Sequence, residues 1–159
     1  MANAQAMTTS FKVEILKAYH QLGAATLTSR TSLTSPTTDT VKAALVLASG
    51  TCGAATTNLS DITGSTEVSG TGYTAGGVTV TNATTPSSSS TTAIWTPSAS
   101  IVYTTVTLAT AFDAVLIYNS SQSNKAISVH TFGSQTVTAG TFTLTMPAND
   151  ASNALIRLA

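Results

Sequence analysis

The sequence predicts a mainly β fold, an antiparallel β-sandwich or jelly roll of about eight strands preceded by a short N-terminal helix. Two observations lead to this class. In the second half of the chain, apolar residues alternate with threonine, which is the period of a half-buried strand. The apolar positions are Val102, Val106 and Leu108, and again Phe142, Leu144 and Met146. Helical spacing occurs only within the first 22 residues. No period of 20–50 residues repeats, which argues against solenoids and propellers.

The sequence predicts an arm and a short helix in the N-terminal region. Residues 1–9 are small and polar, typical of a flexible arm. The apolar residues Phe11, Ile15, Ala18 and Leu22 then follow at helical spacing. Ser10 is the expected cap of this helix, and Gly23 is its expected end. So short a helix needs a docking surface, either its own β-domain, which we favour, or a neighbouring subunit. The expected organisation is therefore an arm and helix at 1–23 and a single β-sandwich domain at 24–159.

The strands are expected where apolar runs or alternation occur between polar connections. The apolar run Val41 to Leu47 predicts a buried strand, and Val78 to Val80 a half-buried one. Ala114 to Tyr118 and Ala126 to Phe132 predict a hairpin around the polar tip 119–125, and Leu155 to Leu158 a last strand. The expected connections are 24–38, 50–70 and the serine-rich loop from Pro86 to Thr92.

The composition favours a surface that lies against other protein. Charged residues make up 8% of the chain, six basic and six acidic side chains cancel, and 42% of residues are hydrophobic. Thr and Ser supply about a third of the chain, and hydroxyls can be buried at an interface at lower cost than ions. Near-zero net charge favours association. A nucleic acid or an anionic membrane as partner would call for a basic excess, so we expect neither.

The start of the chain lacks the pattern of a signal peptide, and no stretch approaches the length of a membrane span. The expectation is synthesis in a cytoplasm without secretion.

The sequence offers little catalytic or metal-binding chemistry, and we expect no catalytic, cofactor-binding or metal-ligating residues and no cofactor. His20 and His130 lack metal-ligand spacing and are expected to be structural or solvent-facing, with His20 near the last carbonyls of the helix. Cys52 has no nucleophile signature around it. Asp61 and Glu67 read as solvated loop carboxylates. The nucleophile elbow G-x-S-x-G does not occur.

A glycine-rich stretch also has a structural explanation. Gly70, Gly72, Gly76 and Gly77 match neither phosphate-binding motif and precede a strand, so turns beside Tyr73 are the expected use. The triplets N-x-[ST] at Asn58, Asn82 and Asn119 are what chance produces in a chain rich in Thr and Ser.

Four blocks in their order resemble a family of small virion proteins of tailed bacteriophages. They are S-F-K-V-E-I-L (Ser10 to Leu16), D-T-V-K-A-A-L (Asp39 to Leu45), E-V-S-G-T-G-Y-T-A-G-G (Glu67 to Gly77) and A-V-L-I-Y-N (Ala114 to Asn119). The glycine-tyrosine block is the most specific, and the blocks span most of the chain.

The resemblance implies a non-enzymatic capsid decoration (cement) protein on the outer capsid surface of the virion. Its partners would be the major capsid protein and further copies of itself, with a trimer favoured. The first alternative is another virion component, such as a head fibre base, neck or tail protein. The second is a glycan-binding module for host attachment, which the few aromatic platforms disfavour, since Trp95 is expected in the core.

Overall fold

The computed structural model describes residues 3–16, 20, 22, 38–81 and 85–159. Within them the chain forms two antiparallel sheets and a short N-terminal helix, which confirms the predicted fold class. The five-stranded sheet has the order β1 (Ala6–Met7), β7 (Lys125–Leu144), β6 (Ile101–Asn119), β2 (Val41–Leu47) and β3 (Val78–Thr79). The three-stranded sheet has the order β4 (Ser87–Ser89), β5 (Thr92–Trp95) and β8 (Ile156–Leu158). The helices are α1 (Thr9–Leu16) and the 3₁₀ helix η1 (Leu59–Asp61).

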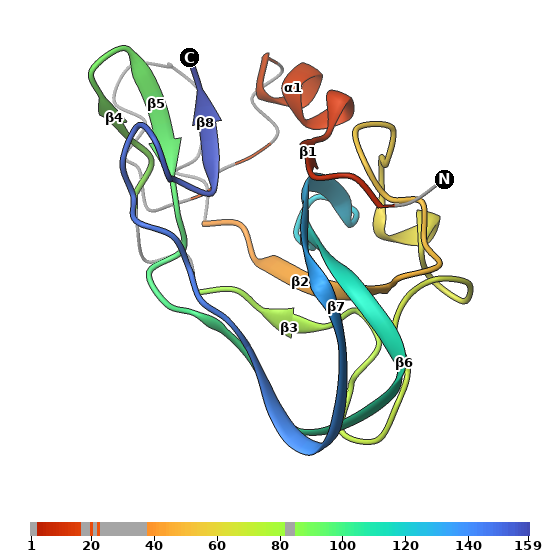
Figure 1. Cartoon of the computed structure of the whole chain (residues 1–159). Coiled ribbons are helices and arrows are strands. Elements are labelled where there is room, and N and C mark those ends of the chain that lie inside the picture. The colour runs from red at the N-terminus through yellow and green to blue at the C-terminus, as the bar shows by residue number, and fades with distance from the viewer. Residues whose placement is uncertain (1–2, 17–19, 21, 23–37, 82–84) are drawn as a thin grey trace.

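One long hairpin organises the larger sheet. The strands β6 and β7 pair from Ile101↔Leu144 to Asn119↔Lys125, around the polar tip that the sequence predicts. The sequence suggested separate strands within each of these segments, whereas the structure has one continuous strand on each side. Register shifts interrupt the pairing several times, and Thr105 and Ala139 adopt positive φ. Such bulges bend a pair of strands, and both β6 and β7 curve strongly at the bottom of the view in Figure 1.

The bulges also change which side chains face inward. Val106 and Leu108 are buried, but Val102 is 40% exposed, so the expected alternation that grouped Val102 with them is wrong. The register shift between Tyr103 and Val106 adds an extra residue to the strand, and Tyr103 takes the inward position instead.

The larger sheet is covered on both faces at its centre. Val41, Ala43 and Leu45 of β2 point into a cluster that includes Trp95 and Ile156 of the smaller sheet. The intervening residues Ala44 and Val46 face a second cluster. That cluster is closed by Cys52, Leu59 and Ile62 of the connection after β2. The predicted buried strand at Val41 to Leu47 is therefore confirmed, and its lack of alternation follows from burial on both faces.

The N-terminal segment is part of this architecture. β1 pairs with β7 at Ala6↔Val129 and Met7↔Ser128, so the flexible arm expected at residues 1–9 is wrong for this strand. Thr8, not Ser10, caps α1, because its Oγ1 accepts a hydrogen bond from the Phe11 amide at 3.2 Å. Phe11 is fully buried in the main core, which places α1 on its own β-domain. Ala18 and Gly23 lie outside the described residues.

The serine run is a second correction. Ser87 to Ser89 form β4 and pair with β5 at Ser87↔Ile94 through Ser89↔Thr92. Ser90 adopts a φ of 55° in the two-residue turn that joins these strands, as tight hairpins require. Serine has a low strand propensity, so composition predicts a loop, but the pairing partner decides the structure.

The glycine-tyrosine stretch lies against the backbones of β2 and β6. A Cβ on Gly77, whose φ is +68°, would come within 1.7 Å of the Ala43 carbonyl oxygen. Glu67 holds the stretch together by accepting hydrogen bonds from the Tyr73 hydroxyl at 3.0 Å and the Gly76 amide at 2.6 Å. Glu67 is therefore half-buried and bonded, not the solvated carboxylate that the sequence suggested.

Candidate interaction surface

The outer part of the long hairpin forms a surface without charge. We call Ile101–Phe112 of β6 and Gly133–Leu144 of β7 the uncharged ribbon; none of its residues is Asp, Glu, Lys or Arg. Its exposed residues are five in β6 and eight in β7: Val102, Thr104, Thr105, Ala109 and Thr110, then Gly133, Ser134, Gln135, Thr136, Thr138, Ala139, Thr141 and Thr143. An ordinary soluble surface of that size would carry about three or four charged side chains. This surface can be dehydrated without removing ions from water.

The ribbon also has a free edge. β1 pairs with β7 only at Ser128 and Val129, so from Gly133 to Leu144 no described strand other than β6 pairs with β7. Its outward amides and carbonyls form a template for an added strand. Natural edge strands are usually protected by charged residues, proline or bulges. Neither a charged residue nor proline occurs between Gly133 and Leu144, and a bulge lies at Ala139.

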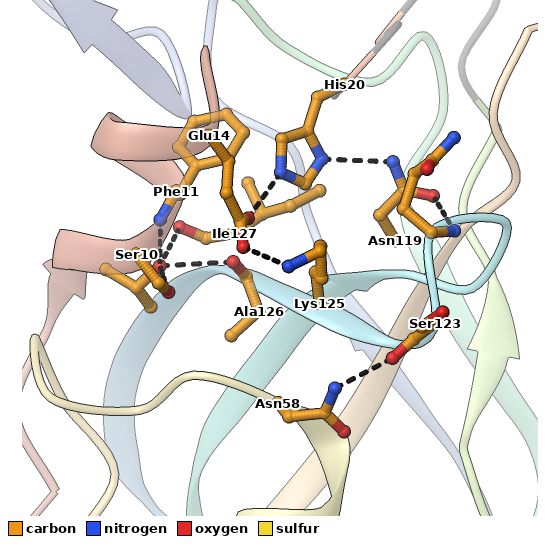
Figure 2. A network of polar contacts seen from close by, with 12 residues as sticks. Ser10, Phe11, Glu14, His20, Asn58, Asn119, Ser123, Lys125, Ala126 and Ile127 are labelled. Carbon is orange, nitrogen blue, oxygen red and sulfur yellow. Dashed lines mark hydrogen bonds and ion pairs between the residues drawn. The ribbon is translucent and has the colours of Figure 1, made fainter. Parts of the chain in front are cut away.

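The opposite end of the hairpin is joined to the N-terminal segment by a polar network. Figure 2 shows Glu14 of α1 directed toward His20 and Lys125, with Asn119 on the far side of the imidazole. Glu14 accepts hydrogen bonds from His20 Nε2 at 2.8 Å and from Lys125 Nζ at 2.5 Å. The side chain of His20 is 1% exposed and that of Glu14 is 9% exposed. Within the described residues, the imidazole of His20 therefore contacts a carboxylate and an amide instead of the last helix carbonyls expected from the sequence.

The amide of Asn119 fixes the hydrogen-bond directions in this network. Its Oδ1 accepts from the amides of Ser121 and Gln122, and its Nδ2 donates to Asp39 at 2.7 Å. The same Nδ2 lies 3.0 Å from His20 Nδ1, so Nδ1 accepts and Nε2 carries the proton donated to Glu14.

Two opposing effects act on the acid strength of Glu14. Burial alone would raise the pKa of this carboxyl, but the hydrogen bonds from Lys125 and His20, together with the charge of the Lys125 ammonium, outweigh it. The pKa of Glu14 therefore lies below its ordinary value of 4.5. An ionised carboxylate thus joins α1 to the tip of the β6–β7 hairpin, and its contribution to stability depends on Lys125 and His20.

The remaining candidate residues have structural surroundings. Cys52 is buried, and burial raises the pKa of its thiol, which disfavours the reactive thiolate. Asp61 accepts from the amides of Thr57 and Asn58 at the start of η1. Asn58 is a helix cap, Asn119 is fully buried, and Asn82 lies outside the described residues.

His130 lines a cavity that sequence reasoning did not find. Its partner across the hairpin is Val115, and its Nε2 lies 2.9 Å from the hydroxyl of Ser128. Burial lowers the pKa of His130 to about 4. The cavity, of about 360 Å³, lies between the larger sheet and the C-terminal segment, and its lining includes Gln5, Asn153 and Arg157. These residues are far apart in sequence, so only the tertiary fold brings them together.

Comparisons of this chain with protein families, curated proteins and solved structures find no match. Among the described residues, no three or more His, Cys, Asp or Glu side chains lie together as a possible metal site. In the same part of the chain, no helix is long and apolar enough to cross a membrane.

Replacement of Lys125 by Met is predicted to destabilise the protein by about 1–3 kcal/mol, because it leaves the buried Glu14 carboxylate with one partner fewer. The measurement is denaturant unfolding at pH 7 followed by the fluorescence of the buried Trp95. Lys42→Met is the matched control, since its ammonium has no hydrogen bond or ion pair among the described residues, and a loss within about 0.5 kcal/mol is expected. Equal losses in both variants would contradict the role assigned to Lys125.

His130 is predicted to weaken the fold in acid. Its pKa lies at about 4 in the folded chain against an ordinary 6.5, so the unfolded chain binds more protons in this interval. Stability should therefore fall as the pH drops from 6.5 to about 4, by up to about 3 kcal/mol from this residue. His130→Gln, which can still accept from Ser128, should flatten this decline in unfolding experiments across that interval. Parallel pH profiles for the two proteins would show that His130 does not titrate in this way.

Proposed function

We propose that this chain is a non-enzymatic structural protein of a tailed-bacteriophage particle, and specifically a capsid decoration protein that binds and stabilises the shell of major capsid protein. The observation that carries the proposal is the uncharged ribbon with its free strand edge. A stable monomer would benefit from charges along such an edge, because an unprotected edge invites pairing with other chains. A chain that is covered in its assembled state has no such need.

Three features of the ribbon fit a permanent protein contact. Apart from Val102 and Gln135, its exposed side chains are hydroxyl-bearing or small, and none is charged, so they can be buried without removing ions from water. Val102, one of two large apolar side chains exposed among the described residues, lies on its outer face at 40% exposure. The bulges at Thr105 and Ala139 bend the edge, which restricts pairing to a partner strand of matching curvature. We therefore assign the ribbon as the contact for an added strand of the neighbouring protein.

The location on the particle follows from the number of copies. A decoration protein would be present in hundreds of copies, whereas a neck or tail protein would be present in about six or twelve, as the symmetry of those parts requires. Quantitative gel analysis of purified particles against the major capsid protein distinguishes these positions.

Two lysines on the ribbon are predicted to abolish binding to particles. The variant Thr136→Lys with Thr141→Lys places charges on exposed positions of the free edge, where lysine opposes strand addition. Particles lacking the protein would be incubated with purified chain and pelleted, and bound chain should fall at least tenfold. The variant should unfold at the wild-type denaturant concentration, since both positions are exposed.

The matched control carries the same two charges elsewhere. Thr51→Lys with Ala55→Lys changes exposed residues of the connection after β2, away from the ribbon, and should bind like the wild type. If both double variants bind equally well, the ribbon is not the contact. If particles lacking the chain withstand heat and osmotic shock as well as complete ones, stabilisation of the shell is not its role.

A further inference from the structure

The His130 cavity is built from four separate parts of the chain. The N-terminal segment contributes Gln5, the two long strands contribute one wall, and the segments 145–147 and 153–157 contribute the other. Its volume of about 360 Å³ is at the small end of the range of about 300–1,000 Å³ for small-molecule sites. The size therefore suits a ligand of about one ring.

The polar groups around the cavity can both donate and accept hydrogen bonds. Gln5 and Thr145 are exposed lining residues whose side chains make no hydrogen bond within the described structure. The imidazole of His130 is bonded to Ser128 through Nε2, which leaves Nδ1 for a ligand. Asn153 uses its Nδ2 on Asp150, and its Oδ1 remains an acceptor. A ligand that satisfies amides, a hydroxyl and an imidazole needs several groups that donate and accept, as sugar hydroxyls do.

The charges of the lining favour a neutral ligand. Among the described lining residues there is no carboxylate to pair with a cation. Burial keeps the imidazole of His130 uncharged near neutral pH. Arg157 is the only charged side chain among the described lining residues, and it already donates a hydrogen bond to the Ser152 carbonyl. The hydrogen bonds from Asn153 and Ser152 lower the pKa of Asp150, and the charge of Arg157 lowers it further. Arg157 is thus partly compensated and serves as a planar hydrogen-bond donor.

Apolar side chains also line the cavity. Phe132, Leu144 and Met146 line it, and Phe132 is held by an edge contact with Phe112 at 6.0 Å between ring centroids. Apolar side chains of this kind suit the C–H face of a pyranose ring, whose hydroxyls can then bond to the polar residues of the lining. Trp95 does not take part, because it is 2% exposed in the core, as the sequence predicts.

We propose that this cavity binds one neutral pyranose unit of a carbohydrate, with its hydroxyls on Gln5, His130, Asn153 and Arg157 and its apolar face on Phe132. The cavity adjoins the end of the uncharged ribbon, because Ile101 and Leu144 belong to both, but none of the ribbon's exposed side chains lines it.

The test uses the full chain labelled with ¹⁵N and titrated with the methyl glycosides of glucose, galactose, mannose and N-acetylglucosamine. At least one of these should shift, in a saturable manner, the amide signals around residues 5, 130–132 and 153–157. The variant Gln5→Leu with Thr145→Val removes two hydrogen-bonding groups from the cavity, and the affinity should fall about tenfold or more. Gln135→Leu with Thr143→Val makes the same changes on the ribbon and should leave the affinity unchanged.

Thermal unfolding of both variants checks that the fold is retained, since all four positions are exposed. The proposal is overturned if none of the four glycosides shifts the cavity signals, or if the two double variants lose affinity equally. Selective binding of glucuronate, lost at high salt, would also overturn it, because the site would then recognise an anion through Arg157.

Discussion

The antiparallel pairing of β6 with β7 is the constraint on which the rest of the structure depends. This pairing joins Ile101–Asn119 to Lys125–Leu144, and its two halves have different surroundings. Near the tip, the strands are central in a sheet covered on both faces, and Leu116 and Ile117 are buried on opposite sides. Beyond the register shifts around Phe112 the same strands become a bent ribbon with an exposed outer face. One hairpin thus supplies both the core and the surface proposed for assembly.

The N-terminal segment stabilises the tip half of this hairpin. β1 adds to β7, and Phe11 enters the core. Glu14 forms an ion pair with Lys125 and accepts a hydrogen bond from His20, whose imidazole also bonds to Asn119. The outer half of β7 has no partner on its free edge among the described residues. The structure is therefore polarised, with charged and buried polar contacts at one end and an uncharged, unpaired strand edge at the other. A protein that works by adding to a larger assembly needs this division, because the stable end preserves the fold while the open end pairs.

Much of the fold could be predicted from local pattern, and the errors have identifiable causes. Apolar runs and the polar residues between them predicted the strand at Val41 to Leu47 and the hairpin tip at 119–125, and the structure contains both. Val102 was assigned to the wrong face of its strand because the bulge at Thr105 cannot be recognised from the order of apolar and polar residues. The serine strand β4 exists through its partner β5, which is a tertiary effect. The His130 cavity and the free edge of β7 could not be predicted, because both depend on which distant segments become neighbours.

Hydrogen–deuterium exchange of β7 tests the central claim most directly. In the isolated chain, the outward-facing amides between Gly133 and Leu144 should exchange within seconds, while those of Ala126 to Val129 remain protected. After assembly onto particles, the same outward amides should become protected by at least a hundredfold, because a partner strand accepts their hydrogen bonds. Unchanged exchange of these amides on particles to which the chain is bound would contradict strand addition at this edge.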